Sequence, residues 1–192
     1  MIRDYLIRMA LSAALFAPVY LLCRWRFLVR AGRWRSGREK GIRELLLLLF
    51  AGYLWGMVTL TMDLPSVLRL ALREGGFRFH GGINFVPLRQ LSAFKEFWVY
   101  EFRLVNVVGN VLMFLPMGFC LTALWRRQRP VAVGVIGTFL FSLSIETVQL
   151  FSYRSTDVDD LILNTLGGLL GTLVCVVLRR LWPGEWPFEQ KS

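Results

Sequence analysis

Acidic and amide side chains interrupt an otherwise apolar part of the sequence, and these are the residues best suited to chemistry. Glu146 and Gln149 lie three positions apart, so they share one face of a helix with Ser142. A charged side chain costs about 2.5–3.5 kcal/mol at the centre of a membrane helix, and less near its ends. We therefore expect Glu146 to be protonated or to face a polar cavity, which makes it a candidate functional carboxylate.

Two other apolar runs carry polar residues at helical spacing. Asn106 and Asn110 are four positions apart, while Asp157, Asp160 and Asn164 follow one face of a later run. The carboxylates could bind a ligand, act as an acid and base pair, or hold a hard cation. The asparagines could instead form hydrogen bonds between helices, worth about 0.6 kcal/mol each.

The segment STDVDD also has a purely structural interpretation. Thr156 could cap the start of a helix, with Asp159 completing a capping box. Aspartates in a first helical turn also complement the helix dipole. Capping and ligand binding are therefore both open for these carboxylates.

The composition indicates that these residues belong to a membrane protein. Hydrophobic residues make up 55% of the 192 residues and charged residues 19%, below the share of about a quarter that is usual in soluble domains. The apolar residues occur in blocks close to the roughly 20 residues that a membrane helix needs. We predict an all-α, polytopic membrane helix bundle with five spans, at 5–23, 43–62, 104–124, 131–151 and 161–178.

The basic residues predict the orientation of these spans. The connections 24–43 and 125–130 are rich in arginine, and the last span ends at Arg179 and Arg180. The positive-inside rule puts these segments in the cytoplasm, with the amino terminus outside and the carboxyl terminus inside. Because this placement accounts for the net charge of +10, we expect no nucleic-acid partner.

The connection 63–103 is then external. Its segment REGGFRFHGGINFVP is punctuated by glycines and predicts a turn or a hairpin. Apolar residues at helical spacing from Leu91 to Val105 predict a helix in the membrane interface before the third span.

In this orientation the polar residues of three spans lie at one depth, near the outer headgroups. We therefore predict a polar cup that opens to the outer leaflet, where arginines could bind phosphate or carboxylate. The catalytic candidates are Glu146, Asp157 and Asp160. The candidate ligand-binding residues are Arg103, Asn106, Asn110, Glu146, Gln149, Arg154, Asp157, Asp159, Asp160 and Asn164.

Histidine and cysteine give no sign of a metal centre. His80 is the only histidine, and Cys23, Cys120 and Cys175 lie far apart in apolar segments. Because no zinc-ligand spacing occurs, we expect free thiols, no metal and no other cofactor.

Four motifs, in order, resemble those of the VanZ-like membrane proteins: NFVPL, NVVGNVLMFLPMGF, SIETVQLF and RSTDVDDLILNTLGGLLG. The similarity covers residues 80–175 and implies an integral membrane protein of the bacterial cell envelope. It also implies a link to resistance against teicoplanin, a glycopeptide antibiotic with a fatty acyl tail, with which the family's named member is associated. The resemblance adds Asn84 to the candidate ligand-binding residues. The residues carried over are Asn84, Pro87, Asn106, Gly109, Asn110, Pro116, Gly118, Glu146, Gln149, Arg154, Asp157, Asp159, Asp160, Asn164 and Gly167.

We predict a multi-pass protein of the bacterial cytoplasmic membrane in three parts. Two amino-terminal spans with a basic cytoplasmic loop (1–62) precede a VanZ-like domain (63–180) and a cytoplasmic tail (181–192). The leading hypothesis is binding of an amphiphile, such as a membrane lipid, a lipid-linked envelope precursor or a lipoglycopeptide. The alternatives are a carboxylate-dependent enzyme of the outer leaflet, acting on a lipid-linked or peptidoglycan-related substrate, and a membrane scaffold subunit. The oligomeric state is open.

Overall fold

The computed structural model describes residues 16–26, 38–62, 64–87, 100–124, 130–152 and 155–182. The chain divides into two compact units, the first within residues 1–62 and the second within residues 63–184. Among the described residues, four helices are long and apolar enough to cross a membrane, at Gly41–Thr61, Leu104–Leu124, Val131–Gln149 and Val158–Leu181. The all-α membrane fold predicted from the sequence is confirmed. The first predicted span, 5–23, falls largely outside the described residues, and the orientation stays a prediction.

The first unit contains a helix at residues 16–26 and helix α2 (Arg38–Thr61). Two contacts join these helices. The rings of Phe16 and Trp55 stack with centroids 5.1 Å apart. The guanidinium of Arg24 donates from Nε and Nη2 to the two carboxylate oxygens of Glu44, each at 2.8 Å. This bidentate geometry orients the two helices at a second point.

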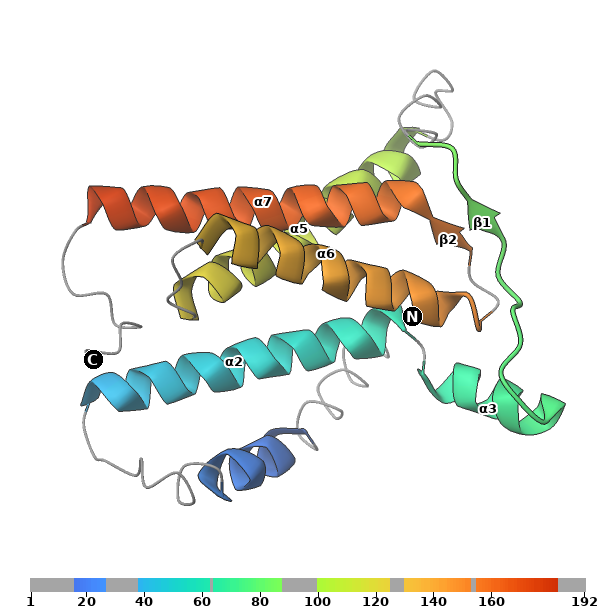
Figure 1. Ribbon diagram of the computed structural model, residues 1–192, viewed down its shortest axis with the longest axis horizontal. Coiled ribbons are helices and arrows are strands. Elements are labelled where there is room, and N and C mark those ends of the chain that lie inside the picture. Colours follow the sequence, from blue (N-terminus) through green and yellow to red (C-terminus); the bar gives the residue numbers. More distant parts are fainter. Residues whose placement is uncertain are drawn as a thin grey trace. The chain divides into compact units, whose positions relative to one another are not determined.

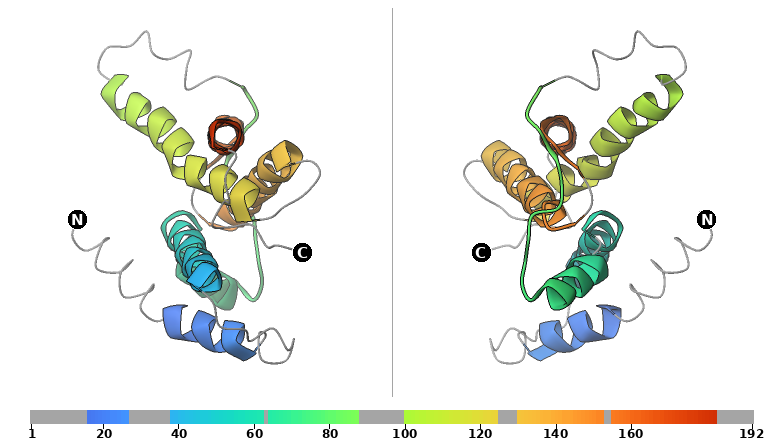
Figure 2. Two further views of the ribbon diagram at one scale, coloured as in Figure 1. Left: turned by 90° about the vertical axis from the view of Figure 1, so that its left-hand side faces the viewer. Right: turned by 90° about the vertical axis from the view of Figure 1, so that its right-hand side faces the viewer.

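The second unit is built around three long helices, α5 (Tyr100–Leu124), α6 (Pro130–Gln149) and α7 (Val158–Leu181). Helix α7 packs on both of the others (Figure 1). Viewed end-on, α7 lies between the inclined helices α5 and α6 (Figure 2). Large apolar side chains on the outer faces of these helices, such as Leu112 and Leu140, are exposed, as expected for surfaces that contact lipid.

Glycines allow α5 and α7 to approach closely. A Cβ built on Gly118 would overlap the carbonyl of Gly168, and one built on Gly171 would overlap the carbonyl oxygen of Leu115. A Cβ built on Gly167 would likewise overlap the carbonyl oxygen of Val111. Small residues at helix interfaces are the usual basis of membrane helix packing, because apolar burial drives little association there.

Buried threonine hydroxyls also lie where these helices pack together. Thr122 donates to the carbonyl of Gly118 in its own helix at 2.8 Å and lies 3.2 Å from the Thr172 hydroxyl. Thr138 donates to the carbonyl of Gly134 at 2.8 Å. Each hydroxyl is therefore satisfied within the helices, which removes the cost of burying it away from water.

The segment between α2 and α5 contains a helix that was not predicted from the sequence, α3 (Leu64–Glu74). Val67 is buried, and Leu70, Ala71 and Glu74 are partly buried at helical spacing. Gly75 adopts a φ of 69°, and the amide of Gly76 donates to the Ala71 carbonyl at 2.9 Å. A left-handed glycine with this bond is a Schellman C-cap, so the helix ends here for a local reason.

The segment after α3 does not form a hairpin. Strand β1 (Ile83–Asn84) instead pairs in parallel with β2 (Thr156–Asp157), the short strand directly before α7. The amide of His80 also donates to the Leu150 carbonyl at 3.0 Å, just after α6. The segment 80–84 is thus bound to the ends of two membrane-length helices. Most of the predicted interfacial helix, 91–105, lies outside the described residues, which resume at Tyr100 with α5.

Candidate functional site

Glu146 is buried at the end of α6, with 5% of its surface exposed, and it contacts the segment that begins α7. Its Oε2 atom accepts a hydrogen bond from the backbone amide of Asp157 at 3.2 Å. Its carbonyl oxygen accepts one from the Thr156 hydroxyl at 3.1 Å. The carboxylate thus satisfies a backbone donor at the α6–α7 turn and does not face acyl chains, in agreement with its cost in lipid.

Asp157 begins α7. As the N-cap residue it accepts from the amide of Asp159 at 3.0 Å, and its Oδ1 atom also accepts from the side-chain amide of Asn84 at 3.0 Å. The prediction that Thr156 caps this helix is wrong by one residue. The Thr156 hydroxyl donates to the Glu146 carbonyl, whereas the Asp157 side chain accepts from the Asp159 amide and so caps the helix. Asp159 is buried in the first turn.

A second acid–amide pair joins α5 to α7. The side-chain amide of Asn110 donates to Oδ1 of Asp160 at 2.7 Å, and both side chains are partly exposed. A bond this short, to a charged acceptor, belongs to the stronger class of hydrogen bonds. Asn106, one turn earlier on α5, is exposed. Because Asn106 lies four residues before Asn110, its side chain is on the same face of α5 and is exposed at the surface.

A third polar contact lies deeper, between α6 and α7. The side-chain amide of Asn164 donates to the Ser142 hydroxyl at 2.9 Å, and both residues are buried. The Oδ1 atom of Asn164 has no hydrogen-bond partner within the described part of the chain. Gln149 is also buried, and its carbonyl accepts from the amide and hydroxyl of Ser152 at 3.0 and 2.9 Å.

These contacts form three hydrogen-bonded groups, and each includes a residue between Asp157 and Asn164. We call their members together the polar cluster, which consists of Asn84, Asn110, Ser142, Glu146, Asp157, Asp159, Asp160 and Asn164. Its members come from β1, β2 and the helices α5, α6 and α7. Most of the candidates from the sequence are therefore brought together. The Arg154 residue and the Arg103 side chain lie outside what the structure describes. Within the described ranges, no three His, Cys, Asp or Glu side chains are placed to hold a metal ion.

Comparisons of the sequence with known proteins identify its family. A family model described as VanZ/LLP1 matches residues 45–179. The chain belongs to the VanZ/LLP1 family. Protein VanZ of Enterococcus faecium is 30% identical over 101 residues, which make up 50% of this chain and 53% of that protein. The match thus spans about half the length of this curated relative, and no solved structure matches.

Family membership and the helices together define the setting of the cluster. A VanZ-like protein with four membrane-length helices is a multi-pass protein of the bacterial cell membrane. The whole polar cluster lies inside the residues that the family model matches.

The members of the cluster differ in what they can do. Glu146, Asp159 and Asn164 are buried, and Glu146 and Asn164 bind partners on a neighbouring segment. Asn84, Asn110, Asp157 and Asp160 are only partly buried and can reach a molecule at the surface. Carboxylates accept hydrogen bonds from hydroxyl and ammonium groups, while amides both donate and accept.

Helical spacing alone did not predict two contacts of this cluster. Ser142 was recognised as sharing the face of Glu146, but not as the partner of Asn164. Asn84 is 73 residues from Asp157, and only the family resemblance pointed to it. A parallel strand pair of two residues has no periodic signal, so spacing could not have revealed this contact.

Proposed function

We propose that this VanZ-like protein binds the polar part of an amphiphile in the polar cluster, at the outer face of the membrane. The observation that carries the proposal is the partly exposed Asn110–Asp160 pair, 2.7 Å apart, between two membrane-length helices. Such residues are costly in a bilayer and are commonly kept there for a function. Nearby Asn106 adds an exposed amide on the same helix.

The chemistry of the cluster favours a ligand rich in hydrogen-bond donors. Asp157 and Asp160 supply partly exposed carboxylates, and Asn84 and Asn110 supply amides. Sugar hydroxyls and amines suit these groups better than phosphate does, because carboxylates repel a second anion. A glycosylated or amine-bearing headgroup, a lipid-linked envelope precursor and a lipoglycopeptide of the teicoplanin type all carry such donors beside an apolar chain.

Photoreactive probes test this proposal on the full chain in membranes. Diazirine derivatives of a phospholipid, of a lipid-linked sugar precursor and of teicoplanin are irradiated separately, and the captured peptides are identified by mass spectrometry. We expect capture of one probe on the first turns of α5 or α7. Asp160→Asn should weaken that capture by about 10- to 100-fold, which corresponds to the roughly 1.5–3 kcal/mol of a hydrogen bond to a charged group.

A matched control is available at the same end of the protein. Glu74 on α3 accepts a hydrogen bond from His80 at 2.9 Å and is not a member of the cluster. Glu74→Gln makes a similar loss of charge and should leave capture unchanged. Equal capture by wild type, Asp160→Asn and Glu146→Gln would refute the proposal.

A second candidate function is supported by the closeness of two acids. Glu146 accepts a hydrogen bond from the backbone amide of Asp157, so these two acidic residues are neighbours at the α6–α7 turn, and an acid and base pair would need both carboxylates to face one substrate. An outer-leaflet enzyme acting on a lipid-linked or peptidoglycan-related substrate would use them in this way. Purified protein incubated with such substrates should then yield product, and Glu146→Gln should abolish the turnover. Binding without turnover would favour the first proposal.

A further inference from the structure

Helix α3 and the segment that follows it expose many large apolar side chains. We call this region the α3–β1 surface, defined by Leu68, Leu72, Phe77, Phe79, Phe85 and Val86. Leu72 is 83% exposed and Phe85 is 75% exposed. Single exposed apolar residues are ordinary on protein surfaces, but this many within one short segment indicate a surface that contacts something apolar.

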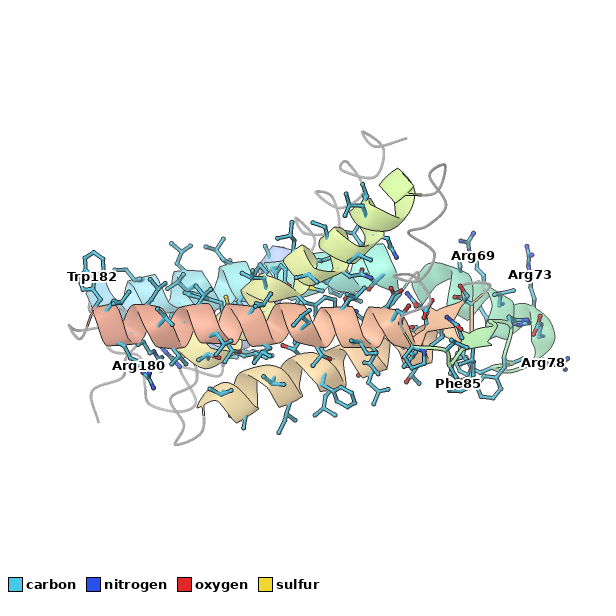
Figure 3. All side chains as sticks on the ribbon, turned by 90° about the horizontal axis from the view of Figure 1, so that it is seen from above. Arg69, Arg73, Arg78, Phe85, Arg180 and Trp182 are labelled. Atoms are coloured by element: carbon cyan, nitrogen blue, oxygen red, sulfur yellow. The ribbon has the colours of Figure 1, made fainter. Side chains whose placement is uncertain are left out.

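Arginines lie among these apolar side chains. Arg69 and Arg73 are exposed on α3, and the Arg78 side chain is 70% exposed. The carboxylate of Glu74 lies 4.0 Å from Arg78 and accepts a hydrogen bond from His80, so it balances only part of the positive charge. The three arginines and Phe85 lie at one end of the bundle, opposite Arg180 and Trp182 (Figure 3).

Hydrogen bonds fix the depth of the α3–β1 surface relative to the membrane helices. The amides of His80 and Gly81 donate to the carbonyl of Leu150, which directly follows α6, at 3.0 and 3.3 Å. The amide of Thr156, two residues before α7, donates to the Gly82 carbonyl at 2.9 Å. Because these bonds join the segment to the ends of two membrane-length helices, we expect its side chains to lie near the level of the lipid headgroups.

We propose that the α3–β1 surface docks onto the headgroup layer of the membrane that the protein spans and binds anionic phospholipid there. The exposed leucines and phenylalanines enter the boundary between headgroups and acyl chains, as in interfacial amphipathic segments. Arg69, Arg73 and Arg78 bind the phosphates, since guanidinium groups match their geometry. This inference does not depend on a ligand in the polar cluster.

Photocrosslinking from the protein side tests the inference. A photoreactive phenylalanine analogue replaces Leu72 or Phe85 in the full chain, reconstituted in nanodiscs of phosphatidylcholine with phosphatidylglycerol. We expect lipid adducts at both positions. The matched control is Gly76, which is exposed in the turn after α3 and where a Cβ meets nothing within 4 Å. Because Gly76 itself contributes no apolar side chain to the surface, we expect fewer adducts there than at Leu72 or Phe85.

The lipid class in the adducts tests the role of the arginines. With the crosslinker at Leu72, Arg73→Gln should lower the ratio of phosphatidylglycerol to phosphatidylcholine adducts by up to about fivefold, while Arg73→Lys should preserve it. A ratio that is the same in Arg73→Gln and wild type would overturn the assignment of anionic lipid. Absence of lipid adducts at Leu72 and Phe85, or crosslinks between two copies of the chain, would overturn the docking surface itself.

Discussion

The packing of α5 against α7 leads to a sharp prediction for Gly118→Ala. The added Cβ would overlap the Gly168 carbonyl oxygen and lie 2.6 Å from its carbon and 2.7 Å from its Cα. All three atoms belong to the backbone, so no side chain can rotate away and the two helices must separate. Overpacking of this kind costs about 1–3 kcal/mol. In a protein of this size, that loss lowers the melting temperature by about 2–12 °C.

The same helix provides the control for this prediction. Gly109 is exposed on α5, and a Cβ added there meets nothing within 4 Å. Gly109→Ala should therefore be neutral or stabilise the helix by up to about 1 kcal/mol. Thermal unfolding of both variants in one detergent, followed by size-exclusion chromatography, measures the difference. Equal melting temperatures for Gly118→Ala and Gly109→Ala would refute the close packing of α5 and α7.

Three further predictions concern the polar groups. Asp157→Ala removes the N-cap of α7 and should cost about 0.5–2 kcal/mol, seen as faster hydrogen exchange in the first turn, while Asp157→Asn should keep most of the cap. A double-mutant cycle of Asn110→Ala and Asp160→Ala, measured by reversible unfolding, should give a coupling of about 1.5–3 kcal/mol, and simple additivity would contradict their bond. Ser142→Ala deprives a buried amide of its acceptor and should cost about 0.6–1.7 kcal/mol, whereas the exposed Ser144→Ala should change the unfolding free energy by less than about 0.5 kcal/mol.

The membrane helices could be predicted from the sequence because their apolar blocks have the length that a bilayer requires. Their ends were harder to place. The last span was predicted to begin at residue 161, but α7 begins at Val158. The predicted bound left out the acidic residues before position 161, although the sequence suggested that they could start a helix, and they form the cap and first turn of α7, where the helix dipole favours negative charge.

Helix α3 shows where the periodic signal was too short. Its inward positions, from Val67 to Glu74, cover only two turns, and the surrounding connection was interpreted as a loop followed by a later helix. Its leucines and arginines separate onto two faces, but several of the leucines, such as Leu68, are exposed instead of buried. The proposed contact with lipid accounts for these exposed apolar residues. The pattern of a soluble helix, with apolar residues only on its buried face, does not predict them.

The candidate site was predictable as a group of residues but not as a set of bonds. Helical spacing and a common depth were enough to suggest that Glu146, Asn110 and Asp160 lie near one another. They could not indicate that Asn110 pairs with Asp160 while Glu146 binds the backbone of Asp157. Such pairing depends on the rotation and separation of the helices, which glycine contacts such as Gly118 with Gly168 determine.

The central claim is that amides and carboxylates of α5, α6 and α7 meet at one end of the bundle and bind the polar part of an amphiphile. An experimental structure of the full chain in nanodiscs of native lipid tests this most directly. We expect non-protein density within hydrogen-bond distance of Asn110 and Asp160, with Glu146 buried at the α6–α7 turn. Glu146 pointing into acyl chains, or a cluster closed to any molecule but protein, would contradict the account.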